Sequence, residues 1–588
     1  MSEPATTLDV PVALGAASLG AAGDGLRLRL PTDGTRPATT AAARLHRPAV
    51  VRDALLAVGD VLGSDLRFRA RDRADYLRYL ISRGKGVSKQ VWDAQKEYLQ
   101  LRYAEAARAE EPLDPVLTVG ADALRLEVLS RDESAYAMLT IGAAALVAPA
   151  LAAGTTAVAL DAAALRAIGK LRTYRTTTVE LAPAADAATA TRRVPLRWLR
   201  ALGQIHAAAL LPAERFALAP VDLYNVLHTL RMRKARQAPR ALRYELVPGQ
   251  PPRIVLEPWD LVLTSSGGPY AGTRPLVVRT WGRARLQTLA RLLPHARSIV
   301  VHLLGAGLPA FYVVDAGDVT LTLGLSGWTD AGWAGVATFD QLAATAAPAD
   351  AALDARLAAG LPLAELTPVT RAAVAARAAG LTAAIDLARG VALARPLLAT
   401  PPPADALRFR DAREAAAHRY LAEAGAVALT KVTDLGADGE RIEGQVEDAR
   451  AHRRYQAAFT LDREGRTAGA ACTCPAFRRS GIKEGPCEHM IAVRVLHARE
   501  QARLAAARAT DDGRRLIRAE TRTLFRRTPR GSETFRLSLD DRAVVARWGQ
   551  AEPLRMTRQL HATADDARAA YFARLAELAR KGYIDATA

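Results

Sequence analysis

The sequence predicts a multidomain α+β protein: a helical N-terminal unit, a large mixed α/β central region, a small metal-stabilised module, and a last unit of strands followed by one helix. Three observations predict this class. The chain has 588 residues, more than a single hydrophobic core accommodates. Apolar residues recur at helical spacing in some segments and in short β-branched runs in others. All 3 cysteines lie in one short segment, as they do in metal sites.

Composition and charge limit the partners. The chain carries 80 Lys and Arg against 61 Asp and Glu, a formal net charge of +19, which favours polyanionic partners through phosphate neutralisation. A basic surface that is only solvated is the alternative. So few cysteines exclude a disulfide framework, and we expect a cytoplasmic protein. The longest apolar run, residues 141–153, is shorter than the roughly twenty residues that span a bilayer, and residues 1–11 lack the pattern of a secretory signal.

Hydrophobic periodicity divides the first two thirds of the chain. Residues 1–48 are rich in Ala, Gly, Thr and Pro, and we expect a disordered tail. Residues 49–112 predict a helical unit, and residues 113–345 a mixed α/β region of unknown function. Residues 346–404 predict a helical segment that ends in a linker at 400–403, because proline removes a backbone donor.

Short β-branched runs predict the strands of the central region. These runs occupy residues 124–129, 176–181, 254–256, 261–264, 276–280, 299–304 and 311–314.

Two pairs of metal-ligand residues follow in residues 405–505. Cys472 and Cys474 are two positions apart, so in an extended backbone both thiols point to one face. Cys487 and His489 repeat this spacing where a helical pattern begins, and the free N–H groups of a helix start favour thiolate. Three thiolates and one imidazole form a closed tetrahedral set that is typical of structural Zn²⁺, with no open position for catalysis. Because His497 lies outside this paired pattern, we expect it on the surface.

The spacing C-x-C-x12-C-x-H resembles the SWIM zinc-finger family, whose layout also includes preceding strands such as residues 442–446 and 455–461. The resemblance implies a zinc-stabilised hairpin-plus-helix module that binds DNA or protein. Arg478, Arg479 and Lys483 lie between the ligand pairs and are candidate phosphate contacts; a solvated loop is the alternative.

An arginine-rich stretch leads into the last unit, residues 515–588, and is either a nucleic-acid contact or a solvated connection. Alternating apolar residues at 535–539 and a second run at 543–548 predict a hairpin, and Thr563 begins a helix that Gly582 ends. With Arg547, Trp548 and Gly549, this unit resembles a WGR domain. The resemblance implies that Arg547 and Trp548 face nucleic acid or a partner. Gln550 stands where that motif has arginine, so this copy departs from the family's pattern at that position.

No compact catalytic signature was found, neither a phosphate-binding glycine loop nor a metalloprotease or hydrolase motif. Residues 265–268 (SSGG) form either an anion-binding nest or an ordinary turn. Residues 154–156 and 195–198 resemble parts of bacterial SWIM proteins encoded near MoxR-type ATPases and von Willebrand A-domain proteins, which implies an adaptor role. Three hypotheses remain: a zinc-containing, non-enzymatic nucleic-acid-binding protein, with DNA favoured; an adaptor for an AAA+ ATPase or a von Willebrand A-domain protein; and an enzyme in the central region.

Overall fold

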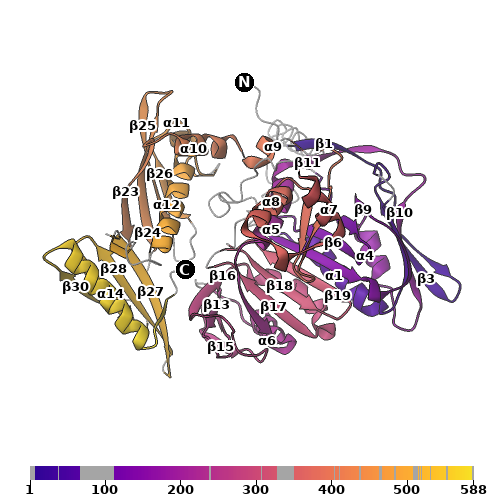
Figure 1. Ribbon diagram of the computed structural model, residues 1–588, viewed down its shortest axis with the longest axis horizontal. Helices are drawn as coiled ribbons and strands as arrows, with labels where there is room; N and C mark the ends of the chain where they lie inside the picture. Colours follow the sequence, from indigo (N-terminus) through magenta and orange to yellow (C-terminus); the bar gives the residue numbers. More distant parts are fainter. Residues whose placement is uncertain are drawn as a thin grey trace, which may run out of the picture.

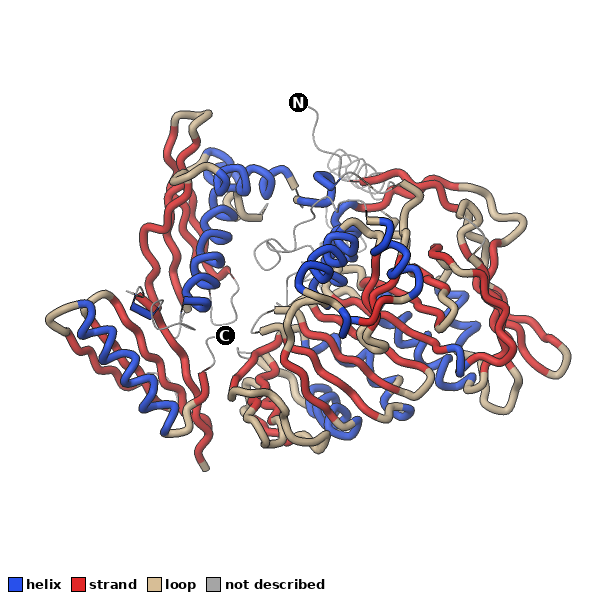
Figure 2. Tube along the Cα trace, in the orientation of Figure 1, coloured by secondary structure: helices blue, strands red, loops and turns tan. Residues whose placement is uncertain are grey.

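The computed structural model shows a multidomain α+β protein in which seven sheets carry most of the described architecture (Figures 1 and 2). It describes residues 7–36, 39–66, 111–236, 240–305, 308–327, 350–400, 402, 404–409, 411–435, 439–461, 467–482, 485–507, 514–515, 517, 519–529, 531–550 and 554–585. No helix among these residues is long and apolar enough to cross a membrane.

The N-terminal residues form strands, so the expected disordered tail is wrong for the described part of residues 1–48. They contribute the strands β1 (Thr7–Val12), β2 (Ser18–Ala22), β3 (Gly25–Thr32) and β4 (Thr40–Leu45). In β3, the buried Leu28 and Leu30 alternate with the exposed Arg27 and Arg29. This period of two specifies a strand, but it is hidden by the Ala, Gly and Pro around it.

Two large sheets form the core of the N-terminal lobe. The five-stranded sheet has the order β2-β3-β10-β4-β8, with β10 (Thr177–Pro183) and β8 (Leu146–Ala152). The eight-stranded sheet runs β12 (Glu214–Leu218), β17 (Ser298–Leu303), β18 (Ala310–Asp315), β19 (Val319–Leu325), β7 (Ala135–Gly142), β6 (Ala123–Leu129), β5 (Val116–Val119), β9 (Gly154–Ala157). A separate ladder pairs β1 with β11 (Ala190–Pro195).

Helices cover the eight-stranded sheet. The first, α1 (Pro48–Gly63), packs on β6, β7 and β19 and accounts for the start of the predicted helical unit. Residues 67–110 of that unit lie outside the described residues. Beside α1 lie α4 (Ala162–Ile168) and the 3-10 helix η2 (Arg283–Arg291), and η2 contacts α6 (Pro220–Met232). Short 3-10 helices also occur at η1 (Ala143–Ala145), η3 (Leu293–His295) and η5 (Leu363–Glu365).

All seven predicted central strands are confirmed within one or two residues, but their pairing is antiparallel except between β10 and β3. The region is therefore α+β and not α/β. Three of these strands belong to a smaller sheet of order β15-β14-β13-β16. Its members are β13 (Leu242–Leu246), β14 (Arg253–Leu256), β15 (Leu261–Thr264) and β16 (Leu276–Thr280).

The segment expected to be helical, residues 346–404, contains helices and also a small sheet. Its helices are α7 (Ala351–Ala359) and α8 (Pro368–Ala379), and α8 packs on the buried α5 (Leu196–Ala209). Its strands are β20 (Leu361–Pro362), β21 (Ala383–Asp386) and β22 (Val391–Ala394). The strands are short and mostly alanine or leucine, so no β-branched run marks them. The short helix α9 (Ala404–Arg408) follows.

The Cys/His module is a four-stranded antiparallel sheet with helices on one face (Figure 1). Its strands are β23 (Val427–Asp434), β24 (Glu440–Asp448), β25 (Arg453–Leu461) and β26 (Thr467–Cys472). Its helices are α10 (Ala412–Ala422), α11 (Pro475–Ser480) and α12 (Glu488–Ala507), and α12 packs on β23, β24 and β25.

The C-terminal module is a five-stranded sheet with α14 (Ala564–Arg580) on one face (Figure 1). The sheet has the order β30 (Arg555–Leu560), β29 (Ala543–Gly549), β28 (Gly531–Asp540), β27 (Ala519–Thr528), β31 (Ile584–Asp585). As predicted, Thr563 caps α14 by accepting from the Asp566 N–H at 3.1 Å.

The C-terminal module docks on the four-stranded β13–β16 sheet. The Phe525 ring lies beneath two guanidinium groups, with Arg243 Cζ 5.2 Å and Arg279 Cζ 4.8 Å from its centroid, both within the range of a cation–π contact. The Ser532 hydroxyl donates to an Asp260 carboxylate oxygen at 3.0 Å.

Candidate metal centre

The first ligand pair is placed by a strand end and a helix start. Cys472 is the last residue of β26, where it pairs with Ala457 of β25. Two residues later Cys474 caps α11, and its Sγ accepts from the Phe477 N–H at 3.4 Å. Pro475 suits this turn because proline fits the first position of a helix, where an N–H has no partner.

The second ligand pair lies at the start of α12. The Ile491 N–H donates to the Cys487 carbonyl at 3.1 Å, so Cys487 immediately precedes the first turn, and His489 lies within that turn. Helix N-terminal N–H groups stabilise negative charge nearby, which suits the Cys487 thiolate.

The fold brings the four residues Cys472, Cys474, Cys487 and His489 into one buried group. Their ligand atoms all lie within 4.8 Å of one another, and their side chains are between 1% and 8% exposed. Cys472 Sγ and His489 Nδ1 are 4.0 Å apart. Zn–S bonds of about 2.3 Å and Zn–N bonds of about 2.0 Å separate tetrahedral ligand atoms by roughly 3.5–3.8 Å. The group can therefore hold a metal ion after small inward shifts of the side chains, and no disulfide links the thiols.

The surroundings of two of the thiols raise their pKa values. The neighbouring Cys472 thiol, together with burial, raises the pKa of Cys487 to about 12, and burial raises the pKa of Cys474 above its usual value. The metal-free Cys474 and Cys487 thiols therefore stay protonated near neutral pH. A bound divalent cation would replace these protons, which is how Cys sites couple metal binding to folding.

Aromatic rings fix the imidazole. His489 stacks on Tyr420, with centroids 5.5 Å apart, and lies 4.4 Å from the Tyr455 ring. Its Nδ1 faces the thiols, whereas its buried Nε2 has no hydrogen-bond partner among the described residues. Tyr420 is itself anchored, because its hydroxyl donates to Asp448 at 3.1 Å. This packing holds the ring in place where a ligating histidine more often uses a hydrogen bond.

The other predicted contact residues lie in different places. Arg478 and Arg479 are exposed on α11, directly after the first ligand pair. Lys483 lies outside the described residues. Arg547 and Trp548 are adjacent on β29 and so point to opposite faces of the sheet. Trp548 stacks on Phe535, 5.8 Å away, in the core beneath α14, so only Arg547 lies on the helix-free face.

His497 and residues 265–268 also have defined places in the structure. His497 is 6% exposed and not on the surface, because it lies on α12, which packs on the sheet. Residues 265–268 form a turn whose donors point to a carboxylate: Ser266 N and Oγ donate to Asp222 at 2.8 and 3.0 Å. Asp222 thus occupies the position that an anion would take.

The N-terminal lobe also contains a buried polar cluster that the sequence does not predict. Glu127 Oε2 accepts hydrogen bonds from His206 Nε2 at 2.7 Å and from the Tyr136 hydroxyl at 3.1 Å, and Arg395 Nε lies 3.5 Å from Glu127 Oε1. His206 Nδ1 accepts from the Ile385 N–H at 3.0 Å, which places the histidine proton on Nε2. These residues come from separate segments and follow no motif. The only signal in the sequence is that polar residues interrupt apolar stretches that form strands and a helix.

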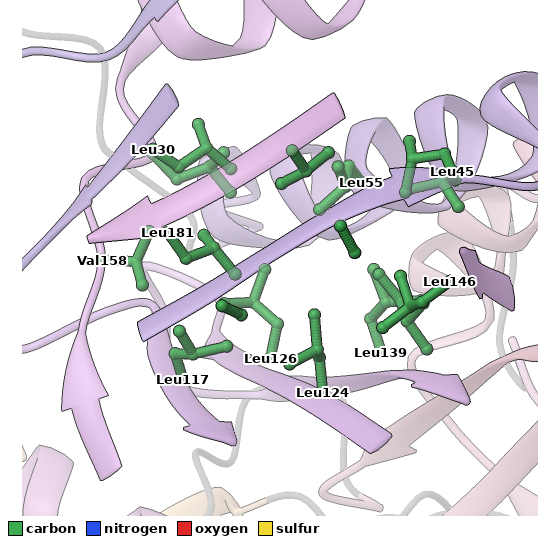
Figure 3. A pocket seen from close by; sticks show the side chains of 16 residues that line it. Leu30, Leu45, Leu55, Leu117, Leu124, Leu126, Leu139, Leu146, Val158 and Leu181 are labelled. Atoms are coloured by element: carbon green, nitrogen blue, oxygen red, sulfur yellow. The ribbon is translucent and has the colours of Figure 1, made fainter. Parts of the chain in front are cut away.

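A cavity of about 40 Å³ lies between the two large sheets and α1, separate from this cluster (Figure 3). Its lining consists of 16 aliphatic side chains, among them Leu45, Leu126 and Leu181. The cavity offers no polar group to a substrate, so it does not support the enzyme hypothesis.

No protein-family model matches this chain, and no curated protein matches it. Among solved structures, a proliferating cellular nuclear antigen from Entamoeba histolytica aligns with 49% of this chain and 98% of its own, at 7% identity and a TM-score of 0.32. That similarity is too low to support a shared fold or function.

Proposed function

We propose that this chain is a zinc-containing, non-enzymatic nucleic-acid-binding protein of the SWIM type, with a WGR-like C-terminal module. The observation that carries the proposal is the buried group of three thiols and one imidazole, whose ligand atoms lie within 4.8 Å of one another. Three sulfur ligands and one nitrogen favour Zn²⁺ over hard cations, and four protein ligands leave no open position for a substrate.

In this proposal the metal organises the Cys/His module. The group ties the end of β26 to the starts of α11 and α12, so one ion connects the sheet to the helix that covers it. Arg478 and Arg479 are exposed on α11, next to ligand Cys474, and are contact candidates on this module.

The helix-free face of the C-terminal sheet supports a polyanion as the ligand. Arg536 of β28 lies directly opposite Arg547 of β29, and Arg558 of β30 pairs with Val545, two residues from Arg547. Because side chains alternate along a strand, all three guanidinium groups belong to this face. Three guanidinium groups on one face of a sheet can follow a phosphate backbone.

Metal content tests the first half of the proposal. The purified chain should carry one equivalent of zinc, and Cys487→Ser and His489→Gln should lose it. His497→Gln is the matched control, because this histidine is on the same helix but outside the group. Full zinc content in Cys487→Ser would overturn the ligand assignment.

Duplex DNA binding across a salt series tests the second half. The slope of log affinity against log salt reports the number of neutralised phosphates, so Arg547→Gln should reduce it by about one contact. Arg580→Gln is the matched control, because this exposed arginine lies on α14, on the other face of the sheet. Equal slopes for the parent chain and Arg547→Gln would exclude this face from the interface.

A second candidate function, a protein-interaction adaptor, is favoured by the strand at the sheet edge. All six residues of β30 are exposed, and Met556 and Leu560 are 61% and 72% exposed. An open edge strand can pair with a strand of another protein. An AAA+ ATPase or a von Willebrand A-domain protein is the partner class to test. Capture should survive nuclease and should fail in Met556→Pro, because Met556 forms a non-hydrogen-bonded pair with Arg547 and its N–H faces the open edge.

A further inference from the structure

The N-terminal lobe carries an exposed basic surface around the turn between α4 and β10, residues 169–176. Four exposed cations and one aromatic ring make up this surface, here called the α4–β10 patch: Arg166, Lys170, Arg172, Tyr174 and Arg175. Tyr174 is 79% exposed. No ion pair engages the four cations within the part of the chain that the structure describes.

The backbone of the turn is held at both ends. Leu171 is fully buried, and its carbonyl accepts from Arg52 Nη1 at 3.1 Å. At the other end the Leu26 N–H donates to the Thr176 carbonyl at 2.8 Å, and Gly25 permits this close approach, since an added Cβ would lie 2.5 Å from that oxygen. The turn is thus a supported projection, and Tyr174 is presented without cover.

Helix electrostatics explain only part of the patch. Arg166, Lys170 and Arg172 lie at the C-terminal end of α4, where cations are favoured, and Arg172 Nη1 donates to the Gly169 carbonyl at 2.8 Å. Arg175 and Tyr174 lie beyond that helix end. An exposed aromatic ring among them has no structural role in the described contacts.

We propose that the α4–β10 patch binds single-stranded nucleic acid, with Tyr174 stacking on a base and the surrounding cations contacting phosphates. Bases of a single strand expose their π-faces to aromatic side chains, while cations follow the backbone. A duplex keeps those faces inside its own stack, so the exposed ring selects the single strand. The inference rests on the proposed function for its ligand class but uses a different lobe, so the two can fail separately.

The test measures binding of a fluorescent oligothymidine to the full-length chain. Tyr174→Ala should weaken binding about 5- to 150-fold, the range of one lost base–aromatic stack, and Tyr174→Phe should retain it. Arg175→Gln should lower the salt slope by about 0.7, the value for one single-strand phosphate contact. Arg131→Gln removes an exposed arginine outside the patch and should leave both quantities unchanged. Because Tyr174 is exposed, unfolding midpoints should not change.

The other outcomes separate the possibilities. Tyr174→Ala binding within twofold of the parent chain, or an equal loss in Arg131→Gln, overturns the assignment of the patch. If Arg547→Gln weakens duplex binding but no patch variant alters oligothymidine binding, the proposed function survives and this inference fails. The reverse pattern retains the patch and removes the C-terminal face. Tyr174-dependent binding to phosphatidylserine vesicles without oligothymidine binding would assign the patch to a membrane surface and overturn the proposal.

Discussion

Replacing Glu127 by Gln should destabilise the N-terminal lobe by about 3–5 kcal/mol, because it removes the countercharge of a buried guanidinium. Arg395 is 0% exposed, and its three side-chain nitrogens make no hydrogen bond among the described residues. Its Nε lies 3.5 Å from Glu127 Oε1, a separation at which unit charges attract by about 5 kcal/mol at an effective dielectric constant of about 20. Burial alone would raise the pKa of Glu127, but Arg395 and His206 lower it to about 2, so the carboxylate is charged at neutral pH.

Urea unfolding followed by tryptophan fluorescence provides the assay, since Trp198 is buried in the core that includes Tyr136. Tyr136→Phe removes one hydrogen bond to Glu127 but leaves the charge, and should cost about 1 kcal/mol. Glu127→Gln combined with Arg395→Met should recover much of the loss, because it removes both charges. An unfolding free energy of Glu127→Gln within 1 kcal/mol of the parent value would refute the countercharge argument. A double variant whose loss of stability equals the sum of the losses in the two single variants would also refute it.

Three further predictions concern other parts of the fold. Burial lowers the pKa of His497 to about 4, so its contribution to stability is present above pH 6.5 and is lost as pH falls toward 4, by about 1.4 kcal/mol per pH unit. His497→Gln should reduce this dependence of the unfolding free energy on pH, and an unchanged dependence would contradict the assignment. An added Cβ at Gly444 would lie 2.7 Å from Val493, so Gly444→Ala should destabilise the Cys/His module by roughly 1–3 kcal/mol. Urea unfolding measures this effect, and an unaltered unfolding midpoint would contradict the prediction. The cavity of about 40 Å³ lowers stability by about 1 kcal/mol, at about 24 cal/mol per Å³. Ala43→Val adds methyl groups to the lining and should raise the unfolding midpoint, whereas a lowered midpoint would show that the space does not accept them.

The sequence indicates these structures where a local pattern determines them. The ligand group was predictable because the paired spacing of its thiols places them on one face of a strand and at a helix start, with no information needed from elsewhere in the chain. The central strands were predictable because β-branched runs mark them. Their antiparallel order was not, because pairing depends on contacts such as β19 with β7, whose residues are far apart in sequence. The strands β21 and β22 carried too little β-branched content to be seen.

The face on which a side chain lies is harder to predict than its element. The strand at residues 543–548 was expected, yet Arg547 and Trp548 were grouped together as contact residues although adjacent strand residues point to opposite sides. The surface expectation for His497 failed because α12 covers several strands and buries more of its circumference than a helix with one apolar stripe. The Glu127 cluster could not be seen, because its members come from β6, β7, α5 and the end of β22 and meet only when the chain is folded.

The two candidate functions use different parts of the C-terminal sheet. A polyanion would lie across the helix-free face, over Arg536 and Arg547, whereas a partner strand would add to the edge at β30 and extend the sheet in its own plane. One end of the helix-free face is already covered, because Phe525 of β27 lies against Arg243 and Arg279 of the β13–β16 sheet. The remaining approach is from the β30 side, next to the open edge. Strand addition would therefore widen the basic face without blocking it, so evidence for one function does not count against the other. A competition experiment with duplex DNA and a partner can show whether both bind at once.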